Sequence, residues 1–550
     1  MNARQPDGQA LSAIYRRAVG KRGIIASAHP LATRAGHDVL VAGGNAVDAA
    51  VSAAAVLGVV QPMMSGLGGD TFVLVRSGVT GRIRSINAGG PAPRAQSLEW
   101  ARNAGLRSLP DRGYLSASVP GAVAGMCAAH QHFGSGRMEL RELLDAAIHH
   151  AVDGVALTPS VARFFAQNIE LLGASESARK AYLDGSDSPL EGRTLRQPDL
   201  GRTLDAIAKG GAPAFYRGEF AERLVRCSAS SGGLFALEDL AEYECDVVEP
   251  ISLKLERGTI YTNPPVGQGV VLLEALGILA CCEPVSGRHV PALRTHRMIE
   301  ALKLAFADRN RYLGDPRFID NPVDRLLSDG HLRARAQRID DARALSGLEE
   351  SWRSFGDGDT TCLTAADVQG NVVAYITSLS TPFGAGVVVE GTGVLMNNRA
   401  GRGFTLEADA PNCLAPGKRT MSTLHTYIVC NESGPMLAGG TSGGDGQPQW
   451  NLQILDAVLN DRVDILDAID RPRWELTPGT DPAHLGQPFE VRMDRRVDPA
   501  LVRYLTSLGH EISDKPLGML GAAQVIAIGG DRSLIGAADG RADGCAMGLD

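Results

Sequence analysis

The sequence is poor in cysteine, and its cysteines lack the spacing of a zinc or redox site. Nine cysteines occur among 550 residues, Cys281 and Cys282 are adjacent, and no two cysteines enclose two residues. Zinc ribbons and thioredoxin-like sites place their cysteines in C-x-x-C pairs. We therefore expect free, mostly structural thiols.

Long apolar runs and an excess of positive charge are also missing. The first 20 residues contain no apolar core of signal-peptide length, and the apolar stretch 49–60 is too short to span a bilayer. The formal net charge is -8, which does not indicate a basic face for DNA or RNA. These absences predict a soluble, cytoplasmic protein with neither a nucleic-acid nor a membrane partner.

The chain does contain a large apolar fraction in which small residues are common. Apolar residues make up 44% of the chain and glycine occurs 65 times, which allows a large core. Stretches such as GGNAVDAAVSAAAVLGVV predict helices packed closely on sheets, because small side chains let backbones approach. The pattern favours a layered α/β body, with helices at 138–152 and 295–312. Residues 343–359 end in a cluster of Gly, Asp and Ser, which indicates an exposed loop.

After residue 360 the pattern becomes strand-like. Residues 361–366 and 372–379 are rich in β-branched and small apolar side chains, and the turn signal DVQGN separates them. A regular hairpin centred on Gln369 places Thr360 opposite Ser378.

A second pair of strand-like runs follows, at 422–430 and 435–444, separated by NESG. Pairing about this turn predicts Ser422 and Thr423 opposite Ser442 and Gly443. Both hairpins would then present hydroxyls or glycines at their ends.

Sequence motifs along most of the chain resemble the γ-glutamyltranspeptidase family. Before residue 360 these are GIIASAHPLATRAGHDVLVAGGNAVDAAV, MSGLGGD, SVPGAVAG, NPPVGQG and EALKLAFADRNRYLGDP, and after it SLSTPFGAGVVVEGTGVLMNN, APGKRTMST and GGTSGG. The resemblance implies an autocatalytic N-terminal-nucleophile (Ntn) hydrolase with a four-layer αββα sandwich. Residues 1–359 would be its large subunit and residues 360–550 its small subunit, a heterodimer cut from one precursor.

The resemblance also implies the catalytic group. Cleavage between Asp359 and Thr360 would make Thr360 a new N-terminus: its hydroxyl attacks the preceding carbonyl, and the ester that forms is hydrolysed. The freed α-amine, with a reference pKa of roughly 7.7 to 8.0, would then act as the base for the same hydroxyl. This chemistry needs neither a metal nor an organic cofactor.

Other site residues are implied by matching positions. Ser378 stands where the family has a threonine that hydrogen-bonds the nucleophile. Gly443 and Gly444 match the glycines whose N–H groups form the oxyanion hole. Ser422 and Thr423 match two serines that contact the substrate carboxylate.

Departures from the family pattern bear on the substrate. Gly89 stands where the transpeptidases have an arginine for the α-carboxylate, and Ser380 stands where they have an asparagine. Arg399 and Arg402 stand where the family has the residues that hold the α-ammonium. Two cations cannot hold an ammonium, because like charges repel by about 4 kcal/mol at ~4 Å in a medium of intermediate dielectric.

These replacements predict an acyl group that lacks an α-amine and carries a carboxylate, with Arg399 as a bidentate clamp. A purely structural role for Arg399 stays open. The segments NNR, APGKR and GGDGQPQW look like the branch of the family that includes oxamate amidohydrolase and glutathione hydrolase-like proteins.

Two other functions remain as alternatives: a γ-glutamyltransferase or glutathione hydrolase, and an uncleaved binding protein of the same fold. The exact amide substrate, the acceptor and the association of two heterodimers also stay open. Weaker signals are interpreted structurally: His296 and Glu300 as a helix-surface pair without a third metal ligand, and His425 as a packed histidine.

Overall fold

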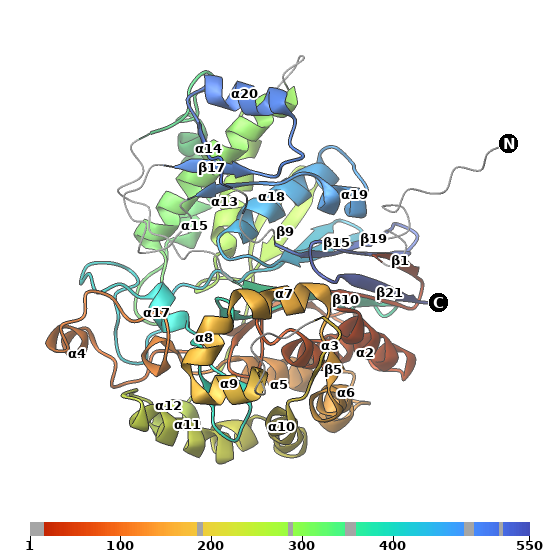
Figure 1. Ribbon diagram of the computed structural model, residues 1–550. Helices are drawn as coiled ribbons and strands as arrows, with labels where there is room; N and C mark the ends of the chain where they lie inside the picture. Colours follow the sequence, from red (N-terminus) through yellow and green to blue (C-terminus); the bar gives the residue numbers. More distant parts are fainter. Residues whose placement is uncertain are drawn as a thin grey trace.

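A computed structural model describes residues 16–183, 191–283, 290–346, 359–477, 489–515, 517 and 521–550. Two seven-stranded antiparallel sheets pack face to face, and helices cover their outer faces (Figure 1). This arrangement confirms the predicted layered body.

The first sheet contains the predicted nucleophile hairpin. In spatial order its strands are β21 (Cys545–Leu549), β2 (Gly23–Ser27), β10 (Asp359–Asp367), β11 (Val372–Ser380), β3 (Asp70–Arg76), β4 (Ile83–Ala88) and β7 (Asp246–Val248). The helices on its outer side are α2 (Pro30–Val41), α3 (Ala46–Val60), α5 (Ala122–Phe133), α6 (Leu140–Asp153) and α10 (Pro198–Tyr216).

The second sheet faces the first across the interior. Its order is β1 (Arg17–Gly20), β20 (Leu534–Ala538), β19 (Ala523–Ile528), β15 (Gly434–Thr441), β14 (Tyr427–Asn431), β9 (Gly258–Thr262) and β8 (Ile251–Leu255). Its outer helices include α13 (Gly269–Ala280), α14 (Val290–Tyr312), α18 (Gly446–Leu459), α19 (Ile465–Asp470) and α20 (Pro499–Ser507) (Figure 1).

Smaller elements surround these layers. They are α4 (Leu98–Asn103), η1 (Tyr114–Ser116), α7 (Pro159–Gln167), α8 (Ile169–Ala174), α9 (Glu176–Tyr182), α11 (Glu219–Ser230), α12 (Leu237–Ala241), α15 (Val323–Leu326), α16 (Asp329–Ala336), α17 (Arg399–Gly403), β5 (Val155–Ala156), β6 (Thr194–Leu195), β12 (Val388–Val389), β13 (Val394–Leu395), β16 (Trp474–Thr477), β17 (Glu490–Met493) and β18 (Glu511–Ile512).

Helix α3 shows why small residues suit this architecture. Nearly all of its residues are buried, because it lies between α2, α6 and the first sheet. Asn45 and Asp48 form a capping box at its N-terminus, which satisfies N–H groups that the first turn would otherwise leave without partners. A helix that is apolar all round is expected in such a position.

The predicted helices and the first hairpin are confirmed. Helix α6 (Leu140–Asp153) corresponds to the predicted range 138–152, and α14 (Val290–Tyr312) begins before the predicted range 295–312 and ends with it. In the hairpin Thr361 pairs with Thr377, and the turn closes through Asp367 N–H to Asn371 O at 3.1 Å. Most of the predicted loop 343–359 lies outside the described residues.

The predicted second hairpin is only partly right. Strand β14 begins at Tyr427, which pairs with Gly439, and a bulge follows Val429. Ser422 instead donates its N–H to Val266 O at 2.8 Å, in the segment after β9. The predicted pairing of Ser422 and Thr423 with Ser442 and Gly443 is therefore wrong, because a neighbouring loop takes the backbone hydrogen bonds.

Within the described part of the chain, no helix has both the length and the apolar character needed to cross a bilayer.

Candidate active site

Thr360 lies at the start of β10, and its side chain meets Ser378 on the neighbouring strand. Thr360 is 2% exposed, and its Oγ1 donates a hydrogen bond to Ser378 Oγ at 3.2 Å. Ser378 Oγ also accepts the backbone N–H of Ser380 at 2.9 Å. Ser380 has a φ of 86°, which is uncommon outside glycine and is found most often at functional sites. The contact confirms the juxtaposition expected from the hairpin register.

The two hydroxyls point into the space between the sheets. Side chains alternate between the faces of a strand, so Thr360 shares a face with Cys362, and Ser378 shares a face with Ile376. Cys362 and Ile376 belong to a buried cluster with Phe72, Val266 and Leu424. The candidate site therefore lies at the end of the interface between the sheets.

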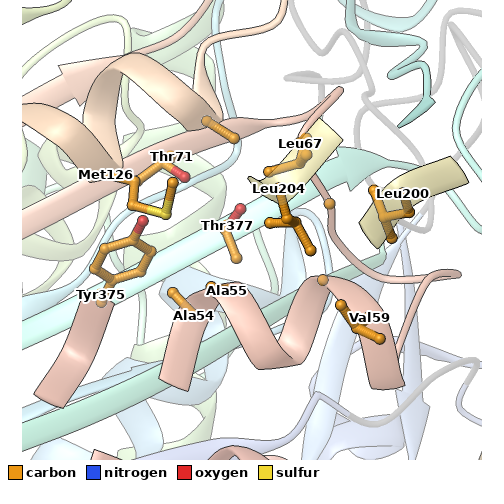
Figure 2. Close-up of a pocket in the computed structure, with 13 residues that line it drawn as sticks. Ala54, Ala55, Val59, Leu67, Thr71, Met126, Leu200, Leu204, Tyr375 and Thr377 are labelled. Carbon is orange, nitrogen blue, oxygen red and sulfur yellow. The ribbon is translucent and has the colours of Figure 1, made fainter. Parts of the chain in front are cut away.

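A small pocket occupies the opposite face of the same strands (Figure 2). Tyr375 and Thr377 of β11 and Thr71 of β3 line it together with residues of α3, α5 and α10. Its remaining lining is apolar, and neither Thr360 nor Ser378 contributes to it. This pocket is a feature of core packing rather than the reaction site.

Gly443 and Gly444 form a loop between β15 and α18. Their φ values are 106° and 51°, and a Cβ on Gly443 would lie 2.3 Å from the Trp450 ring. Among the described residues, neither N–H of this pair donates to another group. The loop precedes a helix N-terminus, where exposed N–H groups and the helix dipole favour negative charge. It is therefore suited to bind an oxyanion.

Gln447 connects this loop to Thr360. It lies in the first turn of α18, is 0% exposed, and its Nε2 is 3.4 Å from Thr360 Oγ1. Its own N–H donates to Gly444 O at 3.2 Å. The glycine loop and Thr360 are thus held at the same end of α18.

A buried polar network supports the glycine loop from behind. Gln268 donates from Nε2 to Gly444 O at 3.1 Å and to Thr423 O at 2.9 Å. Arg309 donates to Gln268 Oε1 at 2.6 Å and to Asp445 Oδ1 at 2.7 Å. Burial lowers the pKa of Arg309, and Asp445 opposes that shift. Because buried charges are costly unless they are paired, Arg309 and Asp445 depend on each other.

Arg399 is buried beside β11 and pairs with Asp70 at the start of β3. Arg399 Nε lies 3.0 Å from Asp70 Oδ2, and Asp70 is the register partner of Ser378. Burial raises the pKa of Asp70, while Arg399 and the N–H of Gly90 favour its ionised form. Arg399 Nη2 is buried without a hydrogen-bond partner among the described residues. The Nε side of this guanidinium therefore binds Asp70, and Nη2 remains available as a hydrogen-bond donor.

The remaining predicted residues lie around this centre. Arg402 is half-buried one turn along α17. Burial lowers the pKa of Arg399, and the charge of Arg402 acts in the same direction. Ser422 Oγ accepts the N–H of Leu424 at 3.3 Å, and Gln268 links Thr423 O to Gly444 O.

Comparison with known proteins identifies the family of this chain. Residues 32–549 match the profile of the family described as gamma-glutamyltranspeptidase. The chain belongs to the gamma-glutamyltranspeptidase family. It is therefore an enzyme of the amidohydrolase type, as the sequence motifs predict.

Three relatives show how far the likeness extends. The glutathione hydrolase-like YwrD proenzyme of Bacillus subtilis is 32% identical over 96% of this chain and 99% of its own length. The oxamate amidohydrolase proenzyme of Klebsiella pneumoniae is 34% identical with the same coverage. The crystal structure of a cephalosporin acylase from Bacillus halodurans superposes with a TM-score of 0.88 at 30% identity, over 100% of this chain and 99% of the acylase.

Several supporting residues of this gamma-glutamyltranspeptidase family member were not predicted, although each lies in a recognised motif. Asp70 ends MSGLGGD, Gln268 lies in NPPVGQG, Arg309 lies in ADRNRYLGDP, and Asp445 and Gln447 lie in GGDGQPQW. The motifs could have marked these residues as important. Their partners could not have been read from the sequence, because each contact joins distant segments.

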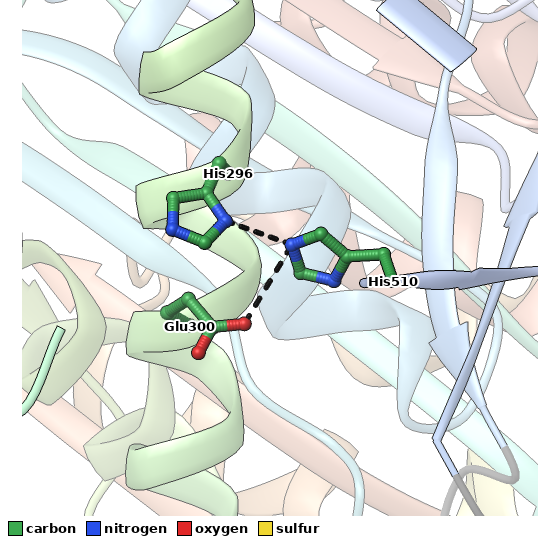
Figure 3. A group of neighbouring side chains, drawn as sticks. All are labelled: His296, Glu300 and His510. Carbon is green, nitrogen blue, oxygen red and sulfur yellow. Dashed lines mark hydrogen bonds and ion pairs between the residues drawn. The ribbon is translucent and has the colours of Figure 1, made fainter. Parts of the chain in front are cut away.

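The interpretation of His296 and Glu300 as a surface pair without a third ligand is wrong. Both residues are buried, and His510 completes a group with them (Figure 3). His296 Nδ1 is 2.8 Å from His510 Nε2, but Lys303 Nζ is 2.8 Å from Glu300 Oε1. Burial lowers the pKa of His510 to about 3. The ammonium already neutralises the carboxylate, so we interpret the group as a structural polar cluster.

A second group of metal-ligating residue types is formed by Glu274, Asp308 and His331. Arg335 pairs with Asp308 there, which again supplies a cation from the protein itself. His425 is buried, its pKa is lowered by burial to about 4, and its Nε2 is 3.1 Å from Asn451 Nδ2. It is packed, as predicted, but not fully satisfied as expected, because its buried Nδ1 has no hydrogen-bond partner among the described residues.

Proposed function

We propose that this enzyme cuts itself between Asp359 and Thr360 and then hydrolyses a small, carboxylate-bearing amide, such as oxamate, through an acyl-Thr360 ester. The observation that carries the proposal is the buried Thr360 hydroxyl at a strand end, bonded to Ser378 and adjoining the glycine loop. The proenzyme names of the relatives support self-processing. The product is a heterodimer of residues 1–359 and 360–550.

Processing and turnover use the same oxygen. In processing, Thr360 Oγ1 attacks the carbonyl carbon of Asp359, the C–N bond breaks, and the resulting ester is hydrolysed by water. In turnover, the free α-amine of Thr360 takes the Oγ1 proton as Oγ1 attacks the substrate amide. The N–H groups of Gly443 and Gly444 stabilise the oxyanion, the protonated amine gives its proton to the leaving nitrogen, and water releases the acid.

The charges near Thr360 favour a carboxylate over an ammonium on the acyl group. Asp70 pairs with Arg399, and both of its oxygens already accept hydrogen bonds, from Arg399 and from Gly90. The buried Nη2 of Arg399 still lacks a partner among described residues. A substrate carboxylate would supply that partner, whereas an α-ammonium beside Arg399 would bring two positive charges together. We therefore propose that Arg399 binds the carboxylate through its Nη end rather than through Nε.

The first test is identification of the chain ends in purified protein. Two fragments, the smaller beginning at Thr360, are expected from the wild type, and one uncut chain of 57.9 kDa is expected for Thr360→Ala. An uncut wild type would instead support a binding protein of the same fold. Processing by Thr360→Ala would remove Thr360 from the mechanism.

The second test compares substrates. Oxamate should be hydrolysed faster than a γ-glutamyl anilide, and Arg399→Gln should raise the KM for oxamate more than tenfold, because a charge-assisted hydrogen bond is lost. Arg402→Gln is the neighbouring control for loss of charge alone. The YwrD relative is named glutathione hydrolase-like, so hydrolysis of glutathione or another γ-glutamyl amide is the second candidate. Faster turnover of the anilide would favour it.

A further inference from the structure

Gln447 presents its amide N–H group to the nucleophile in a fixed orientation. Its Oε1 accepts the backbone N–H of His425 at 3.4 Å, so the opposite end of the amide, Nε2, faces Thr360 Oγ1 at 3.4 Å. The side chain is 0% exposed. Thr360 Oγ1 therefore donates to Ser378 and receives from Gln447.

The position of Gln447 on α18 brings this donor to the oxyanion loop. Helical side chains lean toward the N-terminus of their helix, and the N-terminus of α18 follows Gly443 and Gly444. The oxyanion formed during attack is bonded to the same carbon as Oγ1. A donor that lies beside Oγ1 is consequently also close to the developing negative charge.

We propose that Gln447 is a third hydrogen-bond donor of the catalytic site. In the resting enzyme it holds Thr360 Oγ1, and during attack it donates to the oxyanion together with the N–H groups of Gly443 and Gly444. This inference rests on the proposed function, because it assigns a role in the acylation of Thr360.

Two other glutamines of α18 show what a structural role looks like in this helix. Gln449 bonds the backbone of Leu476, with Oε1 to N–H at 2.7 Å and Nε2 to O at 3.2 Å. Gln453 bonds Trp474 O at 2.9 Å. Both fasten α18 to β16 through backbone groups. Gln447 differs, because its donor is directed at a side chain that reacts.

The test compares Gln447→Met, Gln447→Glu and the control Gln453→Met, all as processed protein with oxamate as the substrate. Gln447→Met keeps the length and removes the donor, so we expect kcat to fall on the order of 10- to 100-fold with little change in KM. Gln453→Met should lower the melting temperature and leave kcat unchanged. The rate of self-processing, measured on fresh precursor, is a second readout of attack by the same oxygen.

Gln447→Glu gives a pH signature that a packing role would not produce. Its carboxyl can donate only while protonated, so the activity of the variant relative to the wild type at the same pH should fall as the pH rises and the carboxyl ionises. An unchanged kcat in Gln447→Met, or a Gln447→Glu profile parallel to that of the wild type, would overturn the inference alone. A wild type without a Thr360 terminus would overturn the proposed function instead.

Discussion

Replacing Arg309 by methionine should damage both the stability and the activity of this enzyme. The Arg309 and Asp445 side chains are 1% and 2% exposed, and the same guanidinium holds Gln268, which holds Gly444. Removal of one partner leaves the carboxylate of Asp445 buried without its counter-charge, which typically costs about 3–5 kcal/mol. Gln268 also loses a hydrogen bond worth about 1 kcal/mol.

The control is Arg294→Met. Arg294 also bonds two aspartates, Asp456 and Asp461, but its side chain is 27% exposed. Water can replace the pair with Asp461, which is worth about 0–1 kcal/mol, and the buried Asp456 keeps the hydrogen bond from Asn460, so the expected cost is smaller than for Arg309→Met. Urea unfolding of the processed enzyme, followed by tryptophan fluorescence, measures both variants under one condition.

The double variant Arg309→Met/Asp445→Asn distinguishes a charge effect from simple loss of packing. Because asparagine removes the stranded charge, the double variant should be more stable than Arg309→Met alone. The kcat of all these variants is measured alongside, and only those altered at Arg309 or Asp445 should lose activity, because the glycine loop moves. The reasoning would be refuted by an Arg309→Met protein that is as stable as Arg294→Met. A double variant that is less stable than Arg309→Met would refute it as well.

Two further predictions concern single side chains. Ser378→Ala should slow processing and turnover by about fivefold, as expected for a hydrogen bond worth roughly 1 kcal/mol. Thr364→Val, which removes a buried hydroxyl from the neighbouring strand β10, should change neither rate, and equal losses in both variants would contradict the role of Ser378. His510, whose pKa is lowered to about 3, stays neutral in the folded protein while the unfolded chain binds a proton near its usual pKa of about 6.5. The unfolded state therefore binds more protons as the pH falls from ~6.5 toward ~3, and stability decreases across that window. His510→Gln should make the decrease shallower in melting temperatures recorded between pH 7 and pH 4, and an identical slope would exclude His510 as its source.

Local chemistry was sufficient to predict the nucleophile hairpin. The DVQGN turn sets the loop, and the two-residue period of a strand then places Thr360 beside Ser378 without any information from the rest of the chain. Helices α6 and α14 were predictable for the same reason, since their periodicity is carried by consecutive residues.

The surroundings of Thr360 were decided only by tertiary structure. Strand pairing failed at Ser422 because a backbone N–H takes whichever acceptor the packed fold brings to it, here Val266 O rather than the opposite strand. Arg399 meets Asp70 across 329 residues, and His510 joins His296 across 214. A sequence can show that a buried charge needs a partner. Which partner it finds depends on how the two sheets and their helices pack, and no local pattern records that.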